Sequence, residues 1–334
     1  MKQTIKRGAN IVTNHWLNLK SGEHLLIVTN ESHRTEAEIL KECALTRTKS
    51  VDLLIIEEGG KQAGILFDES EKIFEGYEAI IAAADYSLIT TRAAKYAIRR
   101  GSKFLSLPLS TNDGRSMLSF SFMTMDTKKS KLMANIIIKY IQSSSVIDIK
   151  TKKGSELKMY KRNRKAGFFN GTVKDGRGFS SASIEVYVPV EEDKTEGVVL
   201  VDGSLGYIGK VEAPFFIRFD NGRITEIEET ISGRKLKEYM EDFHDSGMYV
   251  ASEFGLGLNS IAKCRGKCYI EDESAYGTFH IGLGRNLALG GVHEASGHFD
   301  LVIHEPDIYV DNRQIMEAGK IIIPEPQVYE GGIF

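Results

Sequence analysis

Two residues in the C-terminal part of the chain have the types and the spacing of a metal site. His298 and Asp300 are two positions apart and are followed by the apolar run LVI. On a strand, residues two apart point to the same face, so this pair could bind one metal or contribute to two. The stretch from 253 to 300 also contains Glu253 and His280. Imidazoles and carboxylates together favour a site for a borderline or hard divalent metal.

Each of these residues has a simpler interpretation when it is taken alone. An H-x-D pair is common on protein surfaces, and His280, within the apolar run GTFHIGLG, has the pattern of a hydrogen-bonded core histidine. Glu253 precedes FGLGLN and must be paired, bound to a metal or exposed. Glu185 lies within SASIEVYVPV, and taken alone its pattern favours a solvent-facing position on a strand. Only the combination of these residues, which recur at strand ends of one region, indicates a site.

The elements that must position these residues fall into two halves. In residues 1–145, apolar runs such as HLLIVT and VDLLIIE alternate with helical stretches. We expect helices over 71–83 and 93–100 and a strand over 85–91, in an α/β scaffold domain with a mostly parallel sheet. The first strand is followed by neither a G-x-G-x-x-G turn nor a P-loop, so this domain is expected to be a scaffold or to mediate oligomerisation.

A helix over 126–144 joins this half to residues 146–334, where the pattern changes. Short strand-like runs are broken by turn sequences, of which FDNGRI is the clearest, and one helix is expected near 233–245. We therefore predict a β-rich, barrel-like catalytic domain over 146–334 that binds the metal. The overall fold class is then mixed α/β and α+β.

The composition excludes several classes of function. A net charge of −3 and a pI near 6.3 provide no field that would attract nucleic acid or an anionic membrane. The N-terminal residues have no apolar run, so neither a signal peptide nor a membrane-spanning segment is expected, and the three cysteines (Cys43, Cys264 and Cys268) are too few for a disulfide framework. We expect a cytoplasmic protein. The C-x3-C pair at 264 and 268 is either ordinary thiols, which we favour, or half of a zinc site.

The C-terminal half resembles the thermophilic metalloaminopeptidase family, which is typified by aminopeptidases T and S and includes leucyl aminopeptidases. The landmarks are SIEVYVPV, EGVVLVDGS, FDNGRITEIE, SEFGLGLN, EDESAYGTFHIGLG and GGVHEASGHFDLV. The resemblance implies a hydrolase in which two zinc, cobalt or manganese ions activate water, with Glu253 bridging the metals or acting as general base. The metal ligands that it implies are Glu185, Glu253, Glu273, His280, His298 and Asp300.

One residue departs from that family, and a second activity exists in its superfamily. Leu287 stands where the family has a tyrosine that is thought to assist catalysis. The dihydroxypyridine ring-cleaving dioxygenases share several landmarks and hold one Fe(II) with two histidines and an aspartate. Their first histidine aligns with Glu253, but His280, His298 and Asp300 can still supply such a set.

We predict a metalloaminopeptidase first, an iron dioxygenase as the alternative, and a catalytically degenerate metalloprotein third. The expected substrate is a small peptide or another small molecule, and neither nucleic acid nor a membrane is expected as a partner. The family resemblance further implies a homo-oligomer, a dimer or larger.

Overall fold

The structure is a computed structural model that describes residues 2–57, 63–173 and 178–323. The first half contains a five-stranded parallel sheet in the order β2-β1-β3-β4-β8. Its strands are β1 (His24–Asn30), β2 (Ser50–Ile56), β3 (Ala79–Ala82), β4 (Lys103–Ser106) and β8 (Gly178–Ser181). The edge strand β8 lies beyond residue 146, so a strand from the predicted second domain completes the sheet of the first. The boundary at 145/146 stays a prediction.

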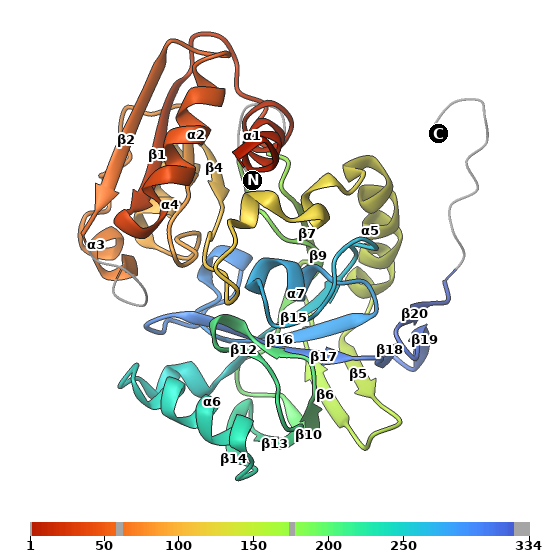
Figure 1. The fold of residues 1–334 in the computed structure, drawn as a ribbon. Helices are drawn as coiled ribbons and strands as arrows, with labels where there is room; N and C mark the ends of the chain where they lie inside the picture. The colour runs from red at the N-terminus through yellow and green to blue at the C-terminus, as the bar shows by residue number, and fades with distance from the viewer. Residues whose placement is uncertain (1, 58–62, 174–177, 324–334) are drawn as a thin grey trace, which may run out of the picture.

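Helices cover both faces of this sheet because its strands are apolar on both sides. Leu25 and Ile27 of β1 pack with one cluster, which includes Leu40, whereas Leu26 and Val28 pack with another, which includes Phe67. The helices are α1 (Lys2–Asn10), which continues as the π-helix Ile11–Trp16, α2 (Arg34–Ala44), α3 (Ala63–Glu69) and α4 (Arg92–Arg100). Figure 1 shows this layered half beside the β-rich half.

Two expected elements in this half are wrong. Residues 79–82 form β3 rather than the end of a helix over 71–83, and α3 precedes that stretch. The run is short, apolar and buried on both faces, and periodicity does not separate such a strand from a helix. The expected strand over 85–91 is a loop that follows β3. The helix expected over 93–100 is confirmed as α4, with Thr91 as its N-cap.

The second half consists of two antiparallel sheets. An eight-stranded sheet has the order β14-β13-β10-β6-β5-β18-β19-β20, and a seven-stranded sheet has the order β12-β11-β17-β16-β15-β9-β7. The strands are β5 (Val146–Lys150), β6 (Glu156–Tyr160), β7 (Gly167–Asn170), β9 (Ile184–Pro189), β10 (Glu196–Val201), β11 (Ser204–Leu205), β12 (Gly209–Lys210), β13 (Phe215–Asp220), β14 (Arg223–Ile227), β15 (Ala251–Gly257), β16 (Thr278–Gly284), β17 (His298–His304), β18 (Asp307–Val310), β19 (Arg313–Glu317) and β20 (Lys320–Ile321).

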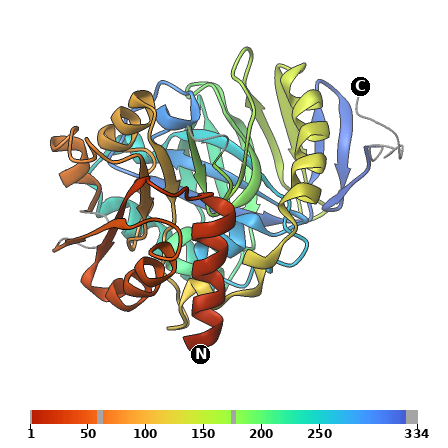
Figure 2. The same ribbon diagram turned by 90° about the horizontal axis from the view of Figure 1, so that it is seen from above.

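One hydrophobic core joins the two sheets. Residues of the eight-stranded sheet, such as Ile149 and Ile217, share it with Phe254, Ile281 and Leu301 of the seven-stranded sheet. The helices α5 (Thr127–Gln142) and α6 (Ile231–Glu241) confirm the two helices expected in this region. Figure 2 shows α5 alongside the β-rich half. The mixed fold class with a parallel N-terminal sheet and a β-rich C-terminal half is therefore correct.

A short helix that the sequence pattern did not indicate, α7 (Tyr269–Ser274), lies between the two halves (Figure 1). Its residues Tyr269 and Ile270 pack with the hydrophobic cluster of the N-terminal half, which includes Leu105 and Leu107. The outer face of the seven-stranded sheet is thereby covered by α7 and the N-terminal half. Among the described residues, no helix has the length and apolar character to cross a membrane.

Candidate metal centre

Four neighbouring strands of the seven-stranded sheet carry polar side chains on the face opposite the core. Glu185 lies on β9, Glu253 on β15, His280 on β16, and His298 and Asp300 on β17. In each strand these residues alternate with core residues, so all five project toward the N-terminal half. The structure thus brings together five of the six ligands that the family resemblance implied. It also buries Glu185, because Phe169 of β7 pairs beside it, whereas its pattern alone favoured a solvent-facing position.

Glycines on the same face create the space that these side chains occupy. Gly282 pairs with Glu253 on one side and with Asp300 on the other, and Gly255 pairs with His280. A Cβ atom at Gly255 would lie 1.8 Å from Nε2 of His280. A Cβ atom at Gly282 would lie 2.7 Å from Cβ of Glu253 and 2.8 Å from Cε1 of His298. The Gly-rich runs FGLGLN and HIGLG therefore have a structural reason, since any side chain there would collide with the cluster.

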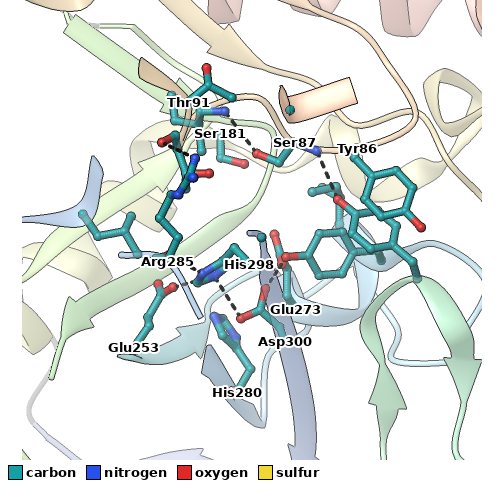
Figure 3. Close-up of a pocket in the computed structure, with 18 of the residues that line it drawn as sticks. Tyr86, Ser87, Thr91, Ser181, Glu253, Glu273, His280, Arg285, His298 and Asp300 are labelled. Atoms are coloured by element: carbon teal, nitrogen blue, oxygen red, sulfur yellow. Dashed lines mark hydrogen bonds and ion pairs between the residues drawn. The ribbon is translucent and has the colours of Figure 1, made fainter. Parts of the chain in front are cut away.

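Among the described residues, two groups offer one ligand atom per residue within 4.8 Å of one another: Glu185–Glu253–His280 and Glu253–His298–Asp300. Nε2 of His298 lies 3.0 Å from Oε2 of Glu253 and 3.4 Å from Oδ1 of Asp300. Figure 3 shows His298 between these two carboxylates. Nε2 of His280 lies 2.8 Å from Oε2 of Glu185. The two-histidine set with Asp300 that the sequence allowed is therefore split, with one histidine in each group.

The pKa values reflect how strongly these groups interact away from water. Burial raises the pKa of Glu253 to about 7. Burial alone would lower the pKa of His280, but the adjacent Glu185 carboxylate outweighs it and raises that pKa to about 9. For Asp300, the attraction of His298 outweighs burial and lowers the pKa to about 2. A buried cluster with more carboxylates than imidazoles favours a cation at its centre.

Two further details fit a metal ion. Nδ1 of His298 lies 2.9 Å from the backbone oxygen of Arg285. Because a carbonyl only accepts, Nδ1 must carry a proton, and Nε2 faces the two carboxylates. Burial alone would lower the pKa of His298, but the charges of Asp300 and Glu253 outweigh it and raise that pKa well above its usual value, so a bound metal would replace a proton on Nε2. Oδ1 of Asp300 is buried and accepts no hydrogen bond from any described residue. A buried carboxylate oxygen whose contact is an ion pair of 3.4 Å with an imidazole is a ready ligand for a divalent metal.

Glu273 lies outside both groups. It is buried on α7, lines the same cavity, and its pKa is held well above the usual range by burial and by the charges of Glu185 and Asp300. The neighbouring phenol of Tyr269 donates a hydrogen bond to Oδ2 of Asp300. Glu273 as a direct metal ligand stays a prediction, whereas its contact with the cavity is observed.

The cluster opens into a cavity between the two halves of the chain. Tyr86, Ser87 and Thr91 line it from the N-terminal half and Arg285 from the second half (Figure 3). Tyr207 of the second half lines it as well. The cavity encloses about 80 Å³, less than the roughly 150 Å³ of an engineered cavity that binds benzene. On this comparison even a single aromatic ring fits only with some movement of the lining residues.

The sequence did not point to these cavity residues, although one signal existed. Tyr86 and Ser87 follow β3 at the carboxyl end of a parallel strand, where ligands bind in open α/β sheets. Two other residues of this region, Leu287 and His293, lie apart from the cluster. Leu287 is half-buried and does not line the cavity, unlike Leu289. His293 is held by the backbone oxygen of Gly247 at 2.8 Å.

The cysteines are also separate from the candidate centre. Cys43, Cys264 and Cys268 are free thiols, and none belongs to either ligand group. Burial raises the pKa of Cys264 and that of Cys268, so both are protonated near neutral pH. Ordinary buried thiols, the favoured interpretation of the C-x3-C pair, agree with this arrangement.

Comparison with known proteins gives one family match and one named relative. Residues 113–323 match the family described as 2,5-dihydroxypyridine 5,6-dioxygenase. A protein of that name from Pseudomonas putida KT2440 is 26% identical over 223 residues, which span 60% of this chain and 60% of the relative.

Two solved structures share the fold. The 2,5-dihydroxypyridine dioxygenase of Pseudomonas putida KT2440 has a TM-score of 0.77 at 17% identity, over 97% of this chain and 99% of that one. Aminopeptidase T of Thermus thermophilus has a TM-score of 0.67 at 16% identity, over 96% of this chain and 100% of that one.

These matches contradict the prediction of a metalloaminopeptidase. The aminopeptidase likeness rests on the fold alone, whereas the family match and the named relative both carry the description 2,5-dihydroxypyridine 5,6-dioxygenase. The hydrolase, aminopeptidase and protease assignments are therefore wrong, and two zinc, cobalt or manganese ions are not supported. The physical reason for the error is that histidine and carboxylate ligands suit hydrolytic zinc and oxygen-activating iron alike.

Proposed function

Because this chain belongs to the family described as 2,5-dihydroxypyridine 5,6-dioxygenase, we propose that it is a metal-dependent dioxygenase that cleaves a small hydroxylated heteroaromatic ring. The observation that carries the proposal is the opening of a buried histidine–carboxylate cluster into a small cavity with aromatic walls. The dihydroxypyridine named for the relative is the first substrate to test.

In this proposal one Fe(II) is held by Glu253, His298 and Asp300. Their ligand atoms lie within 4.8 Å of one another, and the carbonyl of Arg285 orients His298 so that Nε2 faces the two carboxylates. In His280, Nδ1 has no partner among the described residues, and Nε2 is paired with Glu185. When bound, a ferrous ion supplies the redox chemistry that lets dioxygen react with an aromatic ring.

The walls of the cavity orient a flat substrate. Aromatic side chains line it from separate segments of the chain: Tyr86, Phe169, Tyr207, Phe243 and Tyr269. Stacked or edge-on contacts between rings contribute about 0.5–1.5 kcal/mol each beyond simple burial. Packing of the N-terminal half over the cluster keeps the site largely dry, and this strengthens every polar contact inside it.

The second ligand group handles protons in this proposal. Glu185 and His280 form a buried ion pair whose proton is held at Nε2 of the imidazole, beside Glu253. Ser183 donates a hydrogen bond of 2.6 Å to the other oxygen of Glu185 and keeps that carboxylate in place. A ring hydroxyl must release its proton to bind a metal, and this pair is placed to exchange protons with it.

We further propose that the protein works in the cytoplasm on a small molecule and as a homo-oligomer of two or more chains. The free cysteines and the small cavity support the first part. The oligomeric state rests only on the resemblance to oligomeric enzymes, and light scattering of the purified protein tests it.

The test of the proposed function is oxygen uptake by protein purified without air and loaded with iron. Addition of 2,5-dihydroxypyridine should cause oxygen consumption that requires both Fe(II) and the ring. His298→Gln should abolish iron binding and uptake, whereas His244→Gln, which changes an exposed histidine outside the cluster, should affect neither. Iron-loaded protein that consumes no oxygen with any hydroxylated pyridine would refute the proposal.

A further inference from the structure

Tyr269 lines the cavity and contacts Asp300 of the proposed metal centre. It is the first residue of α7 and is 6% exposed. Its phenol donates a hydrogen bond to Oδ2 of Asp300, while Oδ1 of the same carboxylate accepts none from the described residues. The two oxygens of Asp300 are therefore unequal, because one is held by the protein and the other faces His298.

The ring of Tyr269 has little freedom to move. It packs against the tilted ring of Tyr207 with a centroid separation of 4.5 Å, and Tyr207 packs in turn against the tilted ring of Tyr86 at 3.9 Å. The phenol oxygen of Tyr207 accepts the backbone N–H of Ser87 at 3.2 Å. The N-terminal half thus fixes, through a row of packed rings, the phenol that reaches Asp300.

The helix that carries Tyr269 is also held by side-chain hydrogen bonds from Asp272 and from its last residue, Ser274. Asp272 accepts the backbone N–H groups of Arg265 at 2.7 Å and of Gly266 at 3.0 Å. The hydroxyl of Ser274 accepts the backbone N–H of Ile184, next to Glu185 on β9. The position of α7 is therefore tied to the sheet that carries the metal ligands.

We propose that Tyr269 is a positioning residue that limits Asp300 to binding the metal through one oxygen. This inference rests on the proposed metal centre but not on the reaction that follows there. A carboxylate can bind a metal through one oxygen or through both, and the second mode removes a coordination position that a substrate or dioxygen needs. By occupying Oδ2, the phenol keeps that position open.

A purely structural role for Tyr269 makes a different prediction. A buried phenol needs a hydrogen-bond partner, and any acceptor would satisfy it. If that were all, removal of the hydroxyl would change the stability of the fold but would not alter the coordination of a bound metal. The electronic spectrum of a metal in the site separates the two readings.

The experiment compares Tyr269→Phe with the matched control Tyr276→Phe, both titrated with Co(II) as the probe. The phenol oxygen of Tyr276 accepts the backbone N–H of Ile321 and lies outside the cavity lining. We expect Tyr269→Phe to weaken Co(II) binding by roughly 10- to 100-fold, as for other groups that orient metal ligands. Its visible Co(II) bands should also lose intensity as Asp300 gains a second metal–oxygen bond. The control should match the wild type in both respects.

Two outcomes would overturn the inference: wild-type affinity with an unchanged spectrum in folded Tyr269→Phe, or the same losses in the control. If Tyr269→Phe does not fold, fluorotyrosine placed at position 269 keeps the ring and makes a stronger donor. That protein should shift the Co(II) bands, and no shift would equally count against the inference. Oxygen uptake plays no part here, so an inactive protein that shows the spectral change would reject the proposed function and retain this role for Tyr269.

Discussion

The glycines between the ligand strands allow a test of which group binds the metal. In Gly282→Ala the added methyl would lie 2.8 Å from Cε1 of His298 and 2.7 Å from Cβ of Glu253. Carbon atoms pack at about 3.5 Å or more, so both residues must move by roughly 0.7 Å. Metal–ligand bonds tolerate about 0.2 Å. We therefore expect a loss of metal affinity of about 100-fold or more, which corresponds to about 2.8 kcal/mol.

Gly255→Ala is the matched comparison because its methyl meets a different ligand. Its Cβ atom would lie 1.8 Å from Nε2 of His280 and would separate that ring from Glu185. Disruption of a buried pair together with overpacking should reduce the free energy of unfolding by about 3–5 kcal/mol. Because Glu253, His298 and Asp300 are not displaced directly, metal affinity should fall much less than in Gly282→Ala.

The assay is competition between the folded apoprotein and a chelator for Fe(II) or Co(II), with urea unfolding measured on the same samples. His244→Gln, at an exposed position outside the cluster, again serves as the control. Wild-type affinity in Gly282→Ala would refute the assignment of Glu253, His298 and Asp300. A larger loss in Gly255→Ala than in Gly282→Ala would instead place the metal with Glu185 and His280.

Two further changes test other parts of the account. Arg285→Ala removes an ion pair of 2.7 Å with Asp68 of the N-terminal half but keeps the backbone carbonyl that orients His298. Urea unfolding should show that the free energy of unfolding falls by about 1–3 kcal/mol, while metal affinity stays unchanged. A large loss of metal affinity would show that the guanidinium itself acts on the site. The hydrogen bond from His33 lowers the pKa of Asp85 from 3.8 to about 2. A lowered pKa stabilises the fold above about pH 4, and this stabilisation disappears as the pH falls toward 2. Asp85→Asn should therefore cost about 2 kcal/mol at pH 7 and weaken the acid dependence of urea unfolding, whereas an unchanged acid limb would contradict the assignment.

The strand patterns explain how much of the candidate site the sequence could reveal. Residues two apart on a strand share a face, so His298 and Asp300 were expected together, and the structure places them so. Glu185 was harder to judge, because its burial depends on β7, which lies beside it only in the folded sheet. Periodicity describes one element at a time and does not show which strand becomes central.

Other parts of the site left little signal in the sequence. Tyr269 lies on a helix of six residues, too short to show a helical period. The loop that carries Tyr86 was expected to be a strand because it contains the apolar residues Leu88 and Ile89. In the structure these two residues pack against α3 and α4 rather than in a sheet. Both elements reach the cavity only because the two halves of the chain pack against each other.

The reaction itself was the least predictable feature. Glutamate, aspartate and histidine hold hydrolytic zinc and oxygen-activating iron with the same atoms, so the residue types gave the site but not its chemistry. Leu287, the residue at which the chain departs from the aminopeptidase family, does not line the cavity. The shape and aromatic lining of the cavity, which favour a flat ring over a peptide, emerge only in the folded chain.

The central claim is that both atoms of dioxygen enter a cleaved heteroaromatic ring at this site. Iron-loaded protein should be mixed with 2,5-dihydroxypyridine under ¹⁸O-labelled dioxygen, and the product analysed by mass spectrometry. We predict a ring-opened product that carries two labelled oxygens. A product without label, or an intact ring in protein that retains its iron, would contradict the account.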